Sequence, residues 1–163
     1  MKQEQYQDAA DGRKKDAESI RLENGTLFEE IRKFIEQHKT CALAAGHGDF
    51  IQCTPIDYSF REGRFWMFSE DEQKFNGLKH NKNVSIAIYD EYKGFGQLNG
   101  MQINGMAEVV MPFSDEYNFH ARKKGIEIEV LKKLPFVMHL IKVKPTHIDY
   151  LCSGFHYMQQ IFA

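Results

Sequence analysis

Histidine and cysteine are the side chains of this chain best suited to bind a metal or attack a substrate. The seven histidines, including His139, His147 and His156, contain no His-x-x-x-His pair, the spacing that places two imidazoles around zinc on one helix face. The three cysteines contain no Cys-x-x-Cys pair, so neither a disulfide framework nor a zinc knuckle is predicted. They are Cys41, Cys53 and Cys152. We therefore expect no metal site and interpret these thiols as buried or bystander groups.

Other familiar catalytic patterns are missing from the sequence as well. No Ser-His-Asp set is recognisable, so covalent acyl transfer is not predicted. The loop at residues 92–100 contains Gly94 and Gly96, but it lacks the Gly-x-Gly-x-x-Gly spacing that cradles a dinucleotide. The residues alone therefore name no acid, base or nucleophile.

Length and charge limit the classes of protein to consider. The 163 residues suit one domain with a proper core, which we place at residues 24–163 after a charged extension at residues 1–23. A net charge of −2 supplies no basic field, so nucleic acid is not an expected partner. The longest apolar runs are far shorter than the roughly 20 residues that cross a bilayer, and the polar first 22 residues do not resemble a secretory signal. A cytoplasmic location is the expectation.

The elements that must position any site are mostly short strands. A helix is predicted from Thr26 to His38, capped by Thr26 with Glu29 bonding back. Alternating apolar residues and glycine turns then predict strands at residues 40–45, 50–60, 65–68, 84–89, 98–111 and 136–143. The last of these should stop near Pro145, with one or two more strands after His147, and Pro55 should mark an edge, a bulge or a bend. Helices are predicted at residues 70–81 and from the Ser114 cap to Gly125. Residues 127–134 fit either a strand or a helix, and we favour a helix.

Six or more antiparallel strands with a few short helices predict a β-barrel or sandwich with helices at its openings. Six pieces of sequence, in order, then resemble the FMN-binding split β-barrels of the pyridoxamine 5'-phosphate oxidase family. The pieces are residues 53–60 (CTPIDYSF), 65–70 (FWMFSE) followed by Lys74, 81–84 (NKNV), 85–90 (SIAIYD), 102–108 (QINGMAE) and 141–145 (IKVKP). The resemblance covers roughly residues 27–151. It implies a mainly β fold, a six- to seven-stranded antiparallel split barrel that forms a homodimer.

The resemblance also implies a cofactor, FMN, bound at the dimer interface. In relatives the flavin ring lies against the second strand and the phosphate lies near the end of the third strand and the following helix. Lys74 is then the candidate for the phosphate, supported by Ser69 and by the amides of the turn at the helix start. The residues expected to hold the cofactor are Thr54, Pro55, Ile56, Asp57, Phe68, Ser69, Lys74 and Gln102. Gln102 or Asn104 would reach the ring from either subunit. For Phe68 the alternative is sheet core, and for Asp57 an outward-facing carboxylate.

Departures from the family pattern argue against the vitamin oxidation itself. True pyridoxamine phosphate oxidases carry an arginine where Thr54 stands, and a hydroxyl followed by arginine or lysine where Glu72 and Gln73 stand. Either the phosphate is held more weakly here, or Lys79, Lys82 or a base from the partner chain compensates. The C-terminal residues 159–163 also lack the arginine-bearing tail that those oxidases use.

The resulting hypothesis is an FMN-dependent oxidoreductase. It would pass electrons between a reduced nicotinamide, or another donor, and a small-molecule acceptor. Three alternatives stay open: a flavin-binding sensor without turnover, a haem-binding protein on the same barrel that uses His147 or His156, and a deazaflavin protein.

Overall fold

In the part of the chain that the structure describes, one curled antiparallel sheet is accompanied by four helices. The computed structural model describes residues 22–70, 72–94, 97–152 and 157–162. The helices are α2 (Asn24–Gln37), α3 (Glu72–His80), α4 (Asp115–Lys123) and α5 (Ile128–Lys132). The strands are β1 (Thr40–His47), β2 (Phe50–Asp57), β3 (Ser59–Arg61), β4 (Arg64–Ser69), β5 (Asn83–Tyr89), β6 (Asn99–Val110), β7 (His139–Cys152) and β8 (Tyr157–Phe162). The division into an extension and one domain stays a prediction, because residues 1–21 lie outside this description.

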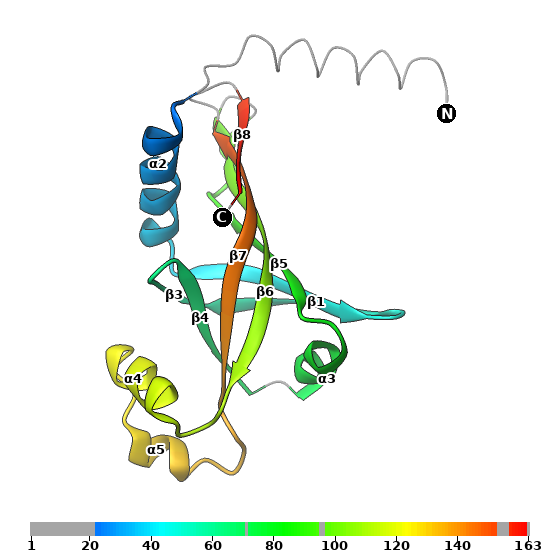
Figure 1. Ribbon diagram of the computed structural model, residues 1–163, viewed down its shortest axis with the longest axis vertical. Coiled ribbons are helices and arrows are strands. Elements are labelled where there is room, and N and C mark those ends of the chain that lie inside the picture. The colour runs from blue at the N-terminus through cyan, green and yellow to red at the C-terminus, as the bar shows by residue number, and fades with distance from the viewer. Residues whose placement is uncertain (1–21, 71, 95–96, 153–156, 163) are drawn as a thin grey trace.

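The sheet curls into a half-barrel. Its strand order is β2-β1-β5-β6-β7-β4-β3, with β8 also paired to β7. The long β6 and β7 run side by side while β1 and β2 cross them (Figure 1). β2 and β4 lie far apart in this order, yet they contact each other across the curl. The predicted mainly β, antiparallel split-barrel class is therefore confirmed.

The sheet has eight strands, one more than the upper end of the predicted count, because of an interruption at Tyr58. We predicted one strand over residues 50–60, but Tyr58 leaves the ladder between β2 and β3. Its amide donates to the Lys39 carbonyl at 2.9 Å, and its hydroxyl donates to the Ile35 carbonyl at 2.7 Å. These bonds tie the strand to the end of α2. Pro55 lies on β2, the last strand at one end of the order, and the predicted edge position is confirmed.

Two predicted boundaries are wrong. The first helix begins at Asn24, and its N-cap is Glu23 without a side-chain cap bond, so Thr26 lies inside the helix. The strand expected to stop near Pro145 runs on as β7 to Cys152. Pro145 lies opposite Gly105, where the pairing with β6 shifts register between Asn104 and Gly105. A bulge takes one residue out of the ladder, so a proline without an N–H is accommodated there.

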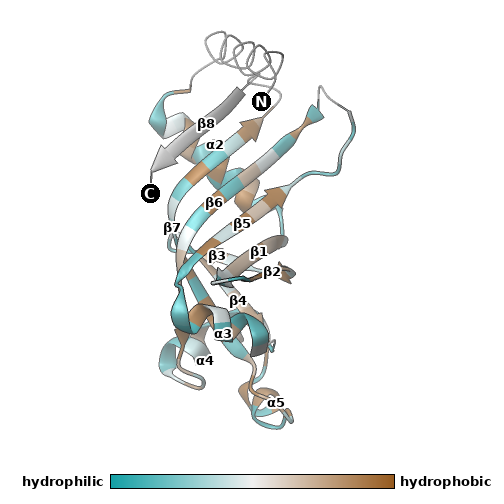
Figure 2. Cartoon of the chain, turned by 90° about the vertical axis from the view of Figure 1, so that its right-hand side faces the viewer, coloured by the Kyte–Doolittle hydropathy of each residue, from teal (hydrophilic) through white to brown (hydrophobic). Residues whose placement is uncertain are grey.

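The sheet has a main core inside the curl and a second core on its outer side. The main core takes alternate residues from every long strand and one face of α2, and hydropathy accordingly alternates along β6 (Figure 2). The second core lies between the sheet and α4–α5. Its buried residues are Trp66, Phe68, Val110, Tyr117, Ala121, Leu131 and Leu140. Along β4, therefore, Phe65 and Met67 enter one core while Trp66 and Phe68 enter the other.

Candidate functional site

A buried amine lies where β4 ends and α3 begins. Lys74, in the first turn of α3, is 1% exposed, and its Nζ donates to the Ser69 hydroxyl at 3.0 Å. Ser69 is the last residue of β4 and is itself buried. A buried ammonium is costly unless it is paired or hydrogen-bonded. A cation, a hydroxyl and the start of a nine-residue helix together offer the donors that a phosphate requires.

The charge of Lys74 acts inside the barrel. The pKa of the Cys41 thiol is raised to about 12, chiefly by burial and also by the charges of Asp57 and Cys53, whereas the charge of Lys74 acts to lower it. The Cys41 thiol is therefore protonated at neutral pH and is not a nucleophile. Cys41 is buried as interpreted, whereas Cys53 is exposed and Cys152 is partly exposed. The electrostatic influence of Lys74 on β1 places the amine beside the main core.

The predicted flavin strand β2 divides its side chains between two faces. Thr54 lies opposite Leu43 and Ile56 opposite Cys41, both of which belong to the main core. Pro55 and Asp57 lie on the other face and are exposed. Residues 54–57 therefore do not line one surface within a single chain.

Thr54 carries a polar atom that points into the curl without a partner. Its Oγ1 is buried and makes no hydrogen bond to any residue in the described part of the chain. Buried hydroxyls normally have a partner. Within the described residues, the hydrogen-bonding capacity of Thr54 Oγ1 is therefore unused.

Asp57 and Phe68 are brought together by a residue that the sequence analysis missed. Lys124, directly after α4, forms an ion pair with Asp57, and its Nζ lies 5.8 Å from the centroid of the Phe68 ring. Phe68 itself is buried in the second core, edge-on to Tyr117 at 5.4 Å. The only sequence signal for Lys124 was the basic run at residues 122–124, which we interpreted as a complement to the helix dipole.

Gln102 lies on the outer face, away from the buried amine. It is exposed on β6, in a cross-strand row with Ala87 of β5, Ala42 of β1 and Pro55 of β2. Three strand spacings separate it from Pro55, about 14 Å at ~4.8 Å per strand. Within one chain Gln102 does not join the other predicted residues, so its expected role depends on a second subunit.

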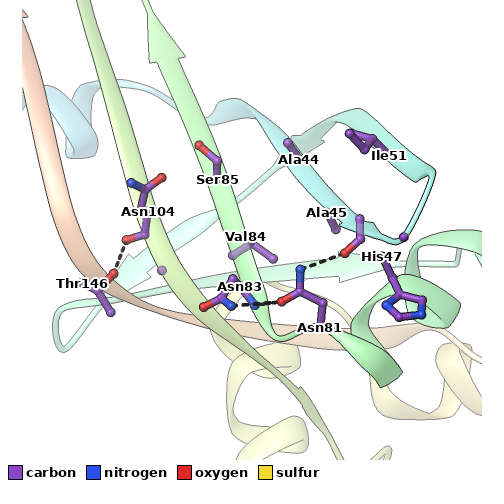
Figure 3. A pocket seen from close by; sticks show the side chains of 13 residues that line it. Ala44, Ala45, His47, Ile51, Asn81, Asn83, Val84, Ser85, Asn104 and Thr146 are labelled. Atoms are coloured by element: carbon purple, nitrogen blue, oxygen red, sulfur yellow. Dashed lines mark hydrogen bonds between the residues drawn. The ribbon is translucent and has the colours of Figure 1, made fainter.

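An open pocket lies on the same outer face, at the end of α3. Its volume is about 610 Å³. Its lining comes from the β1–β2 turn, the α3–β5 connection, and the facing parts of β5, β6 and β7 (Figure 3). Of the residues expected near the cofactor, Asn104 lines this pocket and the others do not.

The chain was compared with known proteins. A family model described as pyridoxamine 5'-phosphate oxidase matches residues 27–152. No curated protein matches the chain. No helix in the described ranges has the length and apolar character that a membrane crossing requires.

Solved structures resemble the chain at low identity. ChuZ from Campylobacter jejuni has a TM-score of 0.68 and 16% identity. The match covers 87% of this chain but only 61% of that protein. The heme storage protein HutZ from Vibrio cholerae has a TM-score of 0.59 and 18% identity, over 77% of this chain and 91% of that one. An FAD-binding protein from Mesorhizobium loti has a TM-score of 0.57 and 15% identity, and the match covers 78% of this chain and 92% of that protein. At such identities the likeness shows the fold alone.

Proposed function

Since the chain belongs to the pyridoxamine 5'-phosphate oxidase family, we propose that it binds FMN and acts as an oxidoreductase. The buried Lys74–Ser69 pair carries this proposal. Electrons would pass between a reduced nicotinamide, or another donor, and a small-molecule acceptor. Structural neighbours include proteins described as binding FAD or heme, so the family fold accommodates large planar cofactors.

The residues present fit an FMN molecule. Lys74 and Ser69 supply a cation and a hydroxyl for the phosphate, next to the free amides of the first turn of α3. Thr54 Oγ1, buried without a partner among the described residues, offers a hydrogen bond between β2 and β4. Bound FMN supplies the electron-transfer chemistry. The protein supplies binding, orientation and charge near the ring, where Asp57 and Lys124 already form an ion pair.

The missing arginine of the family pattern is not replaced by Lys79. Its side chain is exposed and donates to Asn76 Oδ1 at 3.4 Å. Lys74 therefore provides the cation in this proposal, and Thr54 occupies an arginine position with a neutral hydroxyl. A site with fewer cations should hold the phosphate less tightly, and it does not suit the vitamin phosphate reaction.

FMN titration tests the proposal. The flavin absorption bands should stay with the protein after desalting. Lys74→Met removes the charge and keeps the length of the side chain, so FMN affinity should fall at least tenfold while riboflavin affinity, which involves no phosphate, should change little. Lys79→Met on the exposed side of the same helix is the matched control and should bind FMN like the parent. A protein that takes up no FMN at micromolar concentrations would refute the proposal.

Turnover needs a separate measurement. Bound FMN that is reduced by NADH or NADPH and reoxidised by an acceptor supports an oxidoreductase. Bound FMN that neither nicotinamide reduces supports a flavin-binding sensor instead.

Haem is the second candidate, favoured by neighbours described as heme-binding, including one from Mycobacterium smegmatis with a TM-score of 0.65. Of the two proposed iron ligands, His156 lies outside the described residues. His147 uses Nε2 to contact Asp149 at 2.9 Å, and its Nδ1 is buried. Iron ligation by His147 would therefore require its ring to turn. A Soret band after haem titration, lost in His147→Ala, would support haem over flavin.

A homodimer in the cytoplasm completes the proposal. The outer face of β1, β5 and β6 presents small or polar side chains such as Ala42, Ala87 and Gln102, and Figure 2 shows the three strands side by side. A second subunit on this face would bring its Gln102 towards β2 of the first. Light scattering that finds a monomer at micromolar concentration would contradict this part.

A further inference from the structure

His139 lies beside the Lys74–Ser69 pair, although more than 60 residues separate them in the sequence. It is the first residue of β7 and pairs directly with Ser69, the last residue of β4. Side chains of directly opposed residues on antiparallel strands point to the same face of a sheet. Ser69 shares its face with Met67, two residues earlier, which belongs to the main core. The His139 ring therefore lies on the side of the sheet where α3 packs.

The helix α3 contacts the His139 ring directly. Phe75, the residue after Lys74, is 8% exposed, and its ring centroid lies 4.4 Å from that of His139 at an interplanar angle of 48°. Nδ1 of His139 is buried, although the residue as a whole is partly exposed. An imidazole, an ammonium and a hydroxyl thus lie together where β4, β7 and α3 meet.

A phosphate at this place needs more positive charge than Lys74 supplies. A phosphate monoester carries a charge of about −1.5 to −2 near pH 7 and three acceptor oxygens, so one ammonium neutralises only part of it. Gln73, directly before Lys74, is uncharged, and Lys79 is exposed and bonded to Asn76. A protonated imidazole opposite Ser69 supplies both a second positive charge and a second N–H donor.

Charged neighbours determine when the His139 ring is protonated. Lys74 approaches from α3 through Ser69, and its positive charge disfavours a second cation before an anion binds. On β4 the exposed Glu70 follows Ser69, and on β6 the last residue paired with β7 is the apolar Val110. A bound phosphate reverses the balance, because an opposite charge favours the protonated ring. Phosphate binding and proton uptake by the imidazole are therefore linked.

We propose that His139 is the titratable member of this anion site: it donates to the phosphate together with Lys74 and Ser69, and it takes up a proton from solvent as the phosphate binds. The identity of the anion as the FMN phosphate rests on the proposed function, whereas anion binding by these three side chains does not. The phosphate should be held more tightly as the pH falls from 8 to 6.5, because the imidazole becomes protonated there while the phosphate stays mostly a dianion.

FMN and riboflavin are the matched probes, because they differ in the phosphate alone. Titration should show FMN affinity rising by about threefold or more between pH 8 and pH 6.5, with riboflavin affinity unchanged. In calorimetry with buffers of different ionisation enthalpy, FMN binding at pH 7 should take up part of a proton. A histidine that only packs against Phe75 would produce neither result.

Two substitutions separate the charge of His139 from its packing. His139→Gln keeps an N–H donor but does not titrate, so it should bind FMN nearly as the parent does at pH 8, without the gain at pH 6.5 and without proton uptake. His139→Phe keeps a ring against Phe75 and should weaken FMN binding at both pH values. His80→Gln makes the same change at the exposed C-terminal end of α3 and should keep the pH dependence of the parent.

The inference fails if His139→Gln retains the pH dependence, or if FMN binds the parent without proton uptake. Sulfate makes the test independent of the flavin, because its charge is constant over the same pH range. Sulfate should shift the His139 ring signals in NMR in a saturable way, and Lys74→Met should abolish this shift. Ring signals that do not respond to sulfate would overturn the anion site. A parent that responds to sulfate but takes up no FMN would refute the proposed function alone.

Discussion

The two cores handle their buried titratable groups in opposite ways. The main core has the Lys74 amine at its border, bonded to Ser69 where a helix begins. The second core holds His120 flat against Trp66, with ring centroids 3.5 Å apart and an angle of 18°. Burial lowers the pKa of His120, which favours the neutral ring. One region therefore buries an amine that is hydrogen-bonded to a hydroxyl, and the other uses an imidazole as an aromatic packing group.

Burial alone does not mark a functional residue. Both side chains are under a tenth exposed. Lys74 lies next to polar groups, a hydroxyl and a helix start, whereas His120 packs against Trp66 and Phe119. The chemistry of the neighbours separates a site from a core.

The largest expected change in the free energy of unfolding comes from creating a cavity in the main core. Met67 is fully buried, so Met67→Ala should lower the free energy of unfolding by about 3–4 kcal/mol. Leu131→Ala in the second core should cost nearer 2 kcal/mol, because the short helix α5 can settle into the space. Urea unfolding measures both. Equal costs would mean that the two cores are equally rigid.

A smaller loss should follow removal of one hydroxyl from the second core. The Tyr117 hydroxyl donates to the Met138 carbonyl at 2.8 Å. Tyr117→Phe leaves that carbonyl without its partner and should lower the free energy of unfolding by about 1–2 kcal/mol. Because Tyr117→Phe keeps the ring that packs edge-on against Phe68, FMN affinity should stay unchanged. A loss of FMN binding would show that the two cores are coupled.

Acid should weaken the second core through His120. Burial is the main cause of its lowered pKa, with Glu116 acting in the opposite direction. A histidine whose folded pKa lies below its unfolded value of 6.5 is protonated first in the unfolded chain. The contribution of His120 to the free energy of unfolding is therefore fully present above pH 6.5 and is lost as the pH falls below that value.

Denaturation at a series of pH values checks this expectation. His120→Phe keeps an aromatic ring on Trp66 and should flatten the pH dependence between pH 7 and pH 5. His80→Phe, which replaces an exposed imidazole, should leave it as in the parent. If the stability of His120→Phe depends on pH as strongly as that of the parent, a group other than His120 causes the loss of stability in acid.

The smallest effect is expected at the ion pair between Asp57 of β2 and Lys124 at the end of α4. Asp57→Asn breaks the ion pair with Lys124, but the Asp57 side chain is 55% exposed, so the loss should be about 0.5 kcal/mol or less. The potential of bound FMN should move more clearly than stability, because the change leaves Lys124 with an uncompensated charge. A potential equal to that of the parent would place the ring away from this pair.

The fold was largely predictable because β2, β4, β5 and β6 have alternating or strongly apolar sequences between clear turns. The predicted end of a strand near Pro145 was wrong, because β7 continues through it. Thr146 of β7 is the extra residue of a bulge beside Pro145, opposite the step from Asn104 to Gly105, and the sequence of one strand does not show how that strand pairs with its partner. Thr26 failed as a cap because Glu23, three residues earlier, already begins the helix.

Site residues were harder to predict than strands. Lys74 and Ser69 were paired from the family pattern, and they do lie together. Lys124 was missed, because its partner Asp57 is 67 positions away and a basic residue at a helix end has a sufficient local explanation. The open pocket was missed for a related reason: alanine, serine and asparagine on separate strands have no sequence signal until the strands are paired.

The pairing of β4 with β7 has a consequence for how the chain reaches its fold. Phe65 lies opposite Val143, so closing the curl joins residues that are far apart along the chain. Contacts of such long range slow folding and leave unpaired strands exposed meanwhile. During synthesis, β4 must wait for β7 to emerge. Over that interval its apolar residues Phe65–Phe68 are a natural target for chaperones and a risk for aggregation.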